Sequence, residues 1–283
     1  MQTKTAGRFS AWLDNIDFVT PLWRQRSLLR QFTQRNVELR HKGSHLGLIW
    51  SVLNPLLMLT LYVFVFGFIF GGRFGALPKE SPVDYALGVF VSLSIFHFTA
   101  EVLGVGPTLI VANPNFVKKV VFPLEILPVA AVGSSFVHFL ISILLTLLGI
   151  AFFGPGLSWG VLWLPVIFLP VLLLALGLAW FCAALGVFFR DVNQLVGAIS
   201  TGLMFGSAVF YPAKLIVEKS AVAWSILRFN PYIHANELAR AAAMWQTPMN
   251  YSQLAYLYFA GLLTAFGGYY CFRRLRPAFA DVL

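Results

Sequence analysis

Residues 43–72 read GSHLGLIWSVLNPLLMLTLYVFVFGFIFGG and contain no Lys, Arg, Asp or Glu. The 42 residues that precede them carry eight Lys or Arg. A helix over residues 48–70 would rise roughly 35 Å at about 1.5 Å per residue, enough to cross a hydrocarbon layer about 30 Å thick. The abrupt change from a basic segment to a charge-free one predicts that the chain enters a membrane here.

The composition of the whole chain agrees with this prediction. Of its 283 residues, 59% are hydrophobic and 11% charged, and the mean hydropathy is +0.78, which argues against a water-soluble globule. Further apolar spans lie near residues 83–107, 126–153, 161–189, 193–212 and 253–272. Residues 1–40 hold no continuous apolar core of the length that a cleavable signal peptide needs. Cys182 and Cys271 both lie in apolar segments, so we expect buried thiols rather than a disulfide.

The distribution of positive charge predicts the topology. If the N-terminus is cytoplasmic, 14 of the 20 Lys and Arg residues lie in cytoplasmic segments and six lie outside. The bias is strongest around the first span, where orientation is usually set. The predicted fold class is therefore all-α: a polytopic membrane protein with six transmembrane helices and both termini in the cytoplasm.

Three segments outside the main spans have patterns of their own. Residues 18–42 interleave large apolar side chains with arginines, which indicates either an amphipathic helix at the membrane interface or an ordinary basic flank. Residues 113–123 are short, basic and bracketed by Pro114 and Pro123, so they form either a rigid cytoplasmic element or a simple charged turn. Residues 213–252 are too apolar for a flexible loop and indicate short helices that dip back into the outer leaflet.

Two features inside the spans are unusual. Glu101 is a carboxylate within the second span, and His97 lies one helical turn earlier on the same face, so the two side chains are expected to pair. This pair is either a proton or substrate site or a local structural contact. The outer half of the first span has an aromatic ring at every second position, in Tyr62, Phe64, Phe66, Phe68 and Phe70. On a helix this spacing spreads the rings around the circumference, so only some of them can face a translocation path.

The sequence lacks the motifs that ATP hydrolysis, metal binding and glycosyl transfer require. The chain has no GxxxxGK[ST] phosphate-binding loop, so it does not hydrolyse ATP by that route. Its five histidines are scattered and form no arrangement with Cys or carboxylates that resembles a metal site. No paired carboxylates suited to glycosyl transfer lie on an aqueous surface, and membrane topology explains the basic residues without nucleic acid. We therefore expect no catalytic residue, no metal and no nucleic-acid partner.

Five motifs, in the right order and at the right spacing, resemble those of one family. They are SHLGLIW at residues 44–50 with NPL at 54–56, the segment over 113–123, FRDV at 189–192, SAVFYP at 207–212 and NP at 230–231. Over residues 24–276 the chain resembles the permease subunits of bacterial polysaccharide ABC exporters, which move O-antigen, capsule or teichoic-acid chains across the inner membrane. Ala208 stands where the family commonly has proline, and Phe96 where it often has tryptophan.

The resemblance implies an architecture. It implies a cytoplasmic N-terminal segment (1–47) with an amphipathic interfacial helix, a six-helix transmembrane domain (48–272) and a cytoplasmic tail (273–283). Within that domain, residues 110–123 resemble a cytoplasmic coupling helix, and residues 213–250 resemble short re-entrant periplasmic gate helices before the last span. The residues expected to contact the ATPase subunit are Asn113, Asn115, Phe116, Lys118, Lys119 and Phe122.

The resemblance also implies partners and a location. It implies a homodimer around a central path in the bacterial inner membrane, in contact with membrane lipids and with two copies of a nucleotide-binding ATPase subunit. ATP and Mg²⁺ would bind that partner subunit, and this chain itself would bind no cofactor.

A hypothesis for the substrate follows from the resemblance. A glycan linked to undecaprenyl diphosphate would meet the cytoplasmic mouth, where its diphosphate is attracted by Arg35, Arg40, His41 and Lys42. The rings expected to line the path and to let sugars slide by stacking are Tyr62, Phe66, Phe70, Phe96 and Trp180. For any single ring, lipid contact or packing is the competing interpretation.

Several alternatives stay open at this point. A proton-coupled secondary transporter using His97 and Glu101 would need no ATPase. A membrane-embedded transferase would need an accessible acid or base cluster, which the sequence lacks. A membrane scaffold without transport activity explains neither Glu101 nor the polar fifth span. Within the same ABC mechanism, the cargo is O-antigen, capsular polysaccharide or teichoic acid.

Overall fold

The computed structural model describes residues 18–40, 47–118 and 122–283, and these residues form helices and no strand. The α-helices are α2 (Val19–Arg24), α3 (Arg26–Arg40), α4 (Trp50–Tyr62), α5 (Pro82–Val105), α6 (Pro114–Lys118), α7 (Ile126–Phe153), α8 (Leu164–Phe188), α9 (Val192–Gly206), α10 (Ala213–Lys219), α11 (Ala221–Leu227), α12 (Pro231–Arg240), α13 (Tyr251–Leu275) and α14 (Phe279–Val282). Short 3₁₀ turns lie at Gly47–Ile49, Gly106–Thr108, Trp159–Trp163 and Arg276–Ala278, and π-helical segments at Val63–Ile69 and Ala241–Trp245.

Among these residues, five helical stretches are long and apolar enough to cross a membrane. They are Trp50–Ile69, Pro82–Thr108, Ile126–Phe153, Trp159–Phe188 and Tyr251–Val282. Each overlaps a span predicted from the sequence, so the prediction of an all-α, multi-pass membrane protein is confirmed. The remaining predicted span, residues 193–212, forms α9, which has 15 residues. At ~1.5 Å per residue, such a helix rises only about 22 Å.

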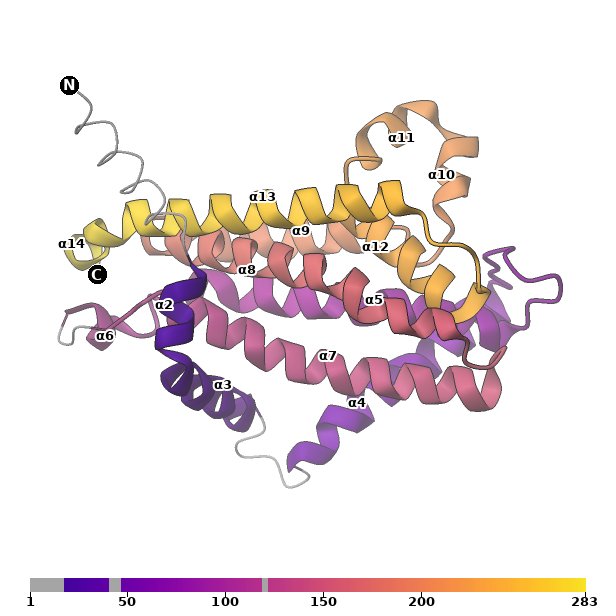
Figure 1. Cartoon of the computed structure of the whole chain (residues 1–283), viewed down its shortest axis with the longest axis horizontal. Coiled ribbons are helices and arrows are strands. Elements are labelled where there is room, and N and C mark those ends of the chain that lie inside the picture. The colour runs from indigo at the N-terminus through magenta and orange to yellow at the C-terminus, as the bar shows by residue number, and fades with distance from the viewer. Residues whose placement is uncertain (1–17, 41–46, 119–121) are drawn as a thin grey trace.

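The chain nevertheless crosses the bundle between α8 and α13. The end of α8 lies beside the C-terminal helix, because the rings of Phe188 and Phe279 are 6.0 Å apart. The start of α13 lies beside the start of α8 at the opposite end, where the rings of Trp163 and Tyr251 are 6.0 Å apart. The connecting chain must therefore pass from one end to the other, and α9 makes most of that crossing (Figure 1). Six spans remains a prediction, which this course of the chain supports.

Helices α8 and α13 pack closely against each other. A Cβ on Gly177 would lie 2.1 Å from the carbonyl oxygen of Thr264, and one on Gly268 would lie 2.0 Å from that of Gly177. Only glycine allows the two backbones to approach so closely, as is common between helices in membranes. Of the five spans, α5 is the most buried and α4 is the most exposed. The outer surface of α4 therefore faces lipid or another chain.

The two ends of the bundle carry different short helices (Figure 1). α6 and α14 lie at the end where α8 finishes, and α10 and α11 lie at the opposite end. Within residues 18–42, where an interfacial helix is predicted, the described residues form α2 and α3, and α3 packs against α7. The predicted short helices over residues 213–250 are seen as α10, α11 and α12. Most of α12 is buried, and it packs against α5, α8 and α13.

Candidate functional site

Three helices bring charged and titratable side chains together near the end of α3. Arg40 is the last residue of α3, Glu101 lies in the last turns of α5, and His138 lies in α7. The Arg40 guanidinium forms an ion pair with the Glu101 carboxylate and also contacts the His138 imidazole. The Glu101 Oε1 and the His138 Nδ1 are 3.2 Å apart. We call these three residues the Arg40–Glu101–His138 cluster.

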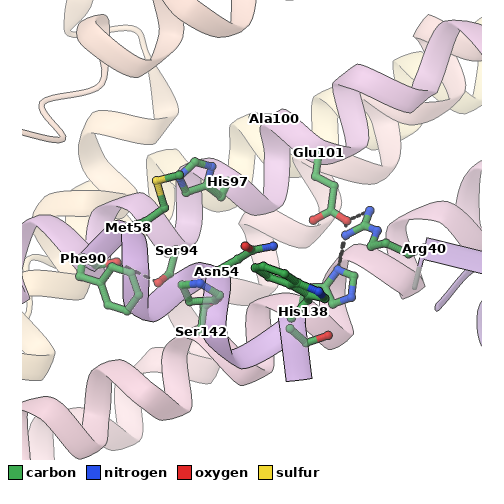
Figure 2. Close-up of a pocket in the computed structure, with 13 residues that line it drawn as sticks. Arg40, Asn54, Met58, Phe90, Ser94, His97, Ala100, Glu101, His138 and Ser142 are labelled. Carbon is green, nitrogen blue, oxygen red and sulfur yellow. Dashed lines mark hydrogen bonds and ion pairs between the residues drawn. The ribbon is translucent and has the colours of Figure 1, made fainter. Parts of the chain in front are cut away.

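The cluster lies at one side of a cavity of about 380 Å³ between α4, α5 and α7 (Figure 2). Its other polar lining residues are Ser51, Asn54, Ser94, His97 and Ser142, and its larger apolar ones include Trp50, Met58 and Phe90. Apolar walls with a few convergent polar groups are typical of ligand-binding pockets. The cavity is therefore the candidate binding site of this chain.

Pairing explains how a carboxylate is tolerated within a span. An unpaired Glu101 at this depth would be costly, and an ion pair with hydrogen-bonded neighbours offsets that cost. The Arg40 side chain is 34% exposed and that of Glu101 is 21% exposed, so both keep some access to water. Partial burial lowers the pKa of Arg40, because the charged form loses hydration. Since a guanidinium has five N–H donors, Arg40 can contact a second anion while it holds Glu101.

The partner predicted for Glu101 was wrong. His97 lies one turn earlier on the same helix, but within the described part of the chain no hydrogen bond or ion pair joins it to Glu101. Its imidazole instead points to another part of the cavity (Figure 2). The reason is that Arg40 and His138 reach the carboxylate from two neighbouring helices, a contact that spacing within one helix does not predict.

Of the four residues expected to attract a diphosphate, Arg40 lies at the cavity. Arg35 is exposed on α3, where its guanidinium carbon lies 5.8 Å from the centre of the Phe32 ring. His41 and Lys42 lie outside the described residues. The phosphate-binding role of all four stays a prediction.

Three of the expected path residues form one row. The rings of Tyr62, Phe66 and Phe70 stack in order, with centres 5.9 Å and 5.7 Å apart. Phe210, from the segment after α9, stacks on Phe66 at 4.7 Å. We call these four residues the aromatic row. It follows the second half of the first span, which is π-helical over Val63–Ile69, and π-helical segments are frequent at functional sites.

The other two expected path residues lie elsewhere. Phe96 is 8% exposed and packs in the same cluster as Phe210, behind the aromatic row. Trp180 is fully buried, and its indole N–H donates to the carbonyl oxygen of Glu125 at 3.2 Å. Trp180 therefore has the position of a core residue.

Aromatic packing holds residues 113–123 against α3. The rings of Phe116 and Phe122 stack at 4.6 Å. Both rings also contact Phe32 of α3, at 5.6 Å and 5.3 Å. The described residues of this segment, 113–118 and 122–123, are thus packed against α3, which a simple charged turn would not require. We call residues 113–123 the coupling segment.

The polar residues of the coupling segment differ in their surroundings. Asn115 and Lys118 are exposed on α6. Asn113 instead donates a side-chain N–H to the Leu109 carbonyl at 2.9 Å, so it stabilises the preceding turn. Lys119 lies outside the described residues.

Three residues of these sites, and the buried Arg240, had no functional prediction from the sequence. His138 is a lone histidine in an apolar run, and its position there is the only signal it gives. Phe210 lies in the SAVFYP motif, which carried the resemblance but no role of its own. Phe32 is one apolar position of an amphipathic pattern. Arg240 reads as one of six positive charges outside the membrane, although the structure buries it completely.

Long apolar helices around a partly buried polar cluster, with short helices at both ends, define a multi-pass α-helical membrane protein. Residues 27–244, more than half of the chain, match the ABC-2 type transporter family. The chain therefore belongs to the ABC-2 type transporter family.

Three relatives illustrate the range of similarity. The chain is 31% identical over 219 residues to the O-antigen export system permease protein RfbA of Myxococcus xanthus. The aligned residues cover 77% of this chain and 80% of the relative. It is 28% identical over 264 residues to an O-antigen export system permease protein RfbA of Klebsiella pneumoniae, covering 90% and 95%. It is 24% identical over 254 residues to the polysialic acid transport protein KpsM of Escherichia coli, covering 86% and 92%. Membership of this family does not favour a proton-coupled secondary transporter.

Proposed function

We propose that this chain is the membrane-spanning subunit of an ATP-driven exporter that moves a lipid-linked polysaccharide out of the cytoplasm. The observation that carries the proposal is membership of the ABC-2 type transporter family, with relatives named for O-antigen export and polysialic acid transport. An O-antigen linked to undecaprenyl diphosphate is the favoured cargo, because the relatives at 31% and 28% identity are named O-antigen permeases. Capsular polysaccharide and teichoic acid are the alternatives.

The Arg40–Glu101–His138 cluster is the proposed contact for the diphosphate of the carrier lipid. Arginine binds phosphate oxygens in a bidentate manner, and Arg40 lies at the edge of the cavity with access to water. A diphosphate would share the guanidinium with Glu101 or displace it. Arg35, His41 and Lys42 would add positive charge close by.

The aromatic row is the proposed lining for the glycan. Sugars can stack on aromatic faces one after another, and no single ring then holds them tightly. Tyr62, Phe66 and Phe70 lie along the end of the first span, and this span, Trp50–Ile69, is the most exposed of the five. Two copies of the chain would enclose the path between them, which requires a homodimer.

Energy would come from a separate subunit, because the sequence contains no phosphate-binding loop. The coupling segment, with Asn115 and Lys118 exposed, is the proposed docking site for that ATPase, which would bind ATP and Mg²⁺. The assembly would hold two permease chains and two ATPase chains in the bacterial inner membrane, with N- and C-termini in the cytoplasm.

The mass and activity of the purified complex test this proposal. We expect a tagged chain extracted in mild detergent to carry two nucleotide-binding subunits per two permeases, and inverted vesicles to take up a lipid-linked glycan only with ATP. A stable assembly without an ATPase, transporting under a proton gradient alone, would contradict the proposal and favour a role for His97 and Glu101 in proton coupling.

A further inference from the structure

The backbone leaves its helical path immediately after α9. α9 ends at Gly206, residues 207–212 are irregular, and α10 begins at Ala213. Ala208 has a φ of 51°, in the left-handed region that residues with a Cβ rarely adopt. Irregular backbone at membrane depth must find its hydrogen-bond partners within the protein. Residues 207–209 have no exposed surface, so water does not supply them.

Side chains from α5, from α12 and from the residue that precedes α12 supply partners for five consecutive carbonyl groups. The Asn230 side chain donates to the carbonyl of residue 206 at 2.9 Å, and the Asn236 side chain donates to the carbonyl of residue 207 at 2.7 Å. Arg240 donates to the carbonyls of residues 208 and 209, at 2.8 Å and 3.4 Å. The Tyr85 hydroxyl donates to the carbonyl of residue 210 at 2.7 Å. Asn230, Asn236 and Arg240 come from one short region of the chain, so α12 and the break after α9 form one hydrogen-bonded unit.

Arg240 lies at the centre of this unit. Its side chain has no exposed surface, and its guanidinium also pairs with Glu237 at 2.6 Å and donates to the Ser92 hydroxyl at 2.8 Å. The guanidinium carbon lies 4.4 Å from the centre of the Phe74 ring. A buried guanidinium is costly unless it is paired and hydrogen-bonded, and a charged residue at such depth is more often functional than incidental. Arg240 is therefore not an ordinary topological charge.

The side chain that this unit holds in place is Phe210. Its ring stacks on that of Phe66 with centres 4.7 Å apart and planes 19° apart, and it lies 5.8 Å from the ring of Tyr62. Only 9% of Phe210 is exposed. This contact joins the outer half of the first span to the break after α9, at the end of the bundle where α10 and α11 lie.

We propose that Phe210 and Phe66 form the outer closure of the translocation path, and that Arg240 is the residue that positions Phe210. The inference rests on the proposed function, because it requires a path beside α4. With the carbonyl groups of residues 208–210 held, the backbone that carries Phe210 cannot shift away from Phe66 on its own. The closure then opens when α12 moves and carries the break with it.

Conductance of the resting complex tests the closure. The full-length protein with its ATPase subunit is placed in a planar bilayer in KCl, without ATP and without glycan. Phe210→Ala removes the ring, and we expect a K⁺ conductance well above that of the wild type. Phe259→Ala, at an exposed phenylalanine on α13, is the matched control and should conduct no more than the wild type. An unchanged conductance in Phe210→Ala would overturn the closure.

A milder variant tests the positioning. Tyr85→Phe keeps the ring and removes the hydroxyl that holds the Phe210 carbonyl. Loss of one neutral hydrogen bond changes a closed-to-open ratio by about fivefold, so we expect a conductance increase of about that size. Tyr258→Phe removes a hydroxyl that donates to the Val166 carbonyl at 3.0 Å, away from the break, and should leave the conductance unchanged.

Arg240→Lys keeps a positive charge beside Glu237 but cannot reach several carbonyl groups at once. We expect a larger conductance than for Tyr85→Phe, and thermal denaturation of the complex shows whether the variant folds. If Phe210→Ala conducts while Tyr85→Phe and a folded Arg240→Lys do not, Arg240 does not position Phe210. ATP-dependent glycan export by the wild-type complex tests the proposed function separately. If the wild type exports no glycan, the proposed function fails, and the conductance of the variants can still be compared.

Discussion

Arg40 has two possible anionic partners. In the structure it holds Glu101, which lies too deep in α5 to be left unpaired. It also lies at the edge of the cavity and is the only Lys or Arg among the described residues that line it. Because the guanidinium has donors for both anions, replacing Arg40 and replacing Glu101 should have different consequences.

Replacing Arg40 by Ala should reduce export while the complex still assembles. The change removes the proposed diphosphate contact and leaves Glu101 with His138. Because the Arg40 side chain is 34% exposed, we expect the free energy of unfolding to fall by only about 1 kcal/mol. ATP-driven glycan uptake by inverted vesicles and thermal denaturation measure the two effects. Arg26→Ala, at an exposed position on the same helix, is the control, and unchanged export in Arg40→Ala would remove Arg40 from the site.

Glu101→Gln separates the ABC mechanism from proton coupling. Glutamine keeps the shape of the side chain and a hydrogen bond to Arg40, but it cannot bind and release a proton. If Glu101 serves to hold Arg40, export should continue at a rate close to that of the wild type. A protonophore added to ATP-energised vesicles should not change that rate. Complete loss of export in Glu101→Gln, with export by the wild type abolished by the protonophore, would favour the proton-coupled alternative.

The sequence locates Glu101 but not its partners. A carboxylate in an apolar run is visible in a single sequence, because its cost in the membrane does not depend on what surrounds it. Arg40 and His138 lie in other helices, and the contact depends on how α3, α5 and α7 pack. No periodicity within α5 contains that information, so His97, the neighbour one turn away, is the only partner the spacing can suggest.

At the scale of elements, α3 connects two sites. Phe32 contacts the coupling segment, and Arg40 at the end of the same helix belongs to the charged cluster. The helix rises about 12 Å between these residues at ~1.5 Å per residue. α3 passes close to α7 at Thr33, because the Thr33 Oγ1 would lie only 2.9 Å from a Cβ on Gly133 of α7. A displacement of the coupling segment would therefore be passed along α3 to Arg40.

Phe32→Ala should lower the amount of glycan exported per ATP hydrolysed. Without the ring, the coupling segment keeps its exposed residues for the ATPase subunit but loses its aromatic contact with α3. Phosphate release and glycan uptake are measured on the same proteoliposomes. Phe152→Ala, at an exposed position on α7 and far from the coupling segment in the sequence, is the matched control. Equal decreases in ATP hydrolysis and export would argue against a transmitting role for Phe32.

The existence of the long helices could be predicted, whereas the end of α9 could not. Runs of about 20 apolar residues identify spans by composition alone. Residues 193–212 read as one continuous span, because Ser207 and Ala208 are both compatible with a helix. In the structure the helix stops at Gly206, since side chains of α5 and of residues 230–240 bind the next carbonyl groups. Those side chains are distant in the sequence, so the local pattern contains no sign of the break.

At the scale of the whole molecule, the short helices divide between the two ends of the bundle. α6 and α14 share one end with the end of α8, and α10 and α11 lie at the other (Figure 1). The N-terminal helix α3 contacts the coupling segment, so it lies near the first of these ends. This arrangement requires the chain to cross the bundle an even number of times, which agrees with six spans if α9 completes one crossing.

Chemical labelling from one side of the membrane tests that topology. Lys214 lies on α10 with its side chain 83% exposed, and Arg274 lies exposed near the end of α13. With Cys182 and Cys271 replaced by Ser, Lys214→Cys should react with an impermeant maleimide in spheroplasts, whereas Arg274→Cys should react only after permeabilisation. The positive-inside bias predicts this direction, because 14 of the 20 Lys and Arg residues then face the cytoplasm. If instead Arg274→Cys reacted in intact spheroplasts and Lys214→Cys reacted only after permeabilisation, α9 would not complete a crossing, and a chain with a cytoplasmic N-terminus would have five spans instead of six.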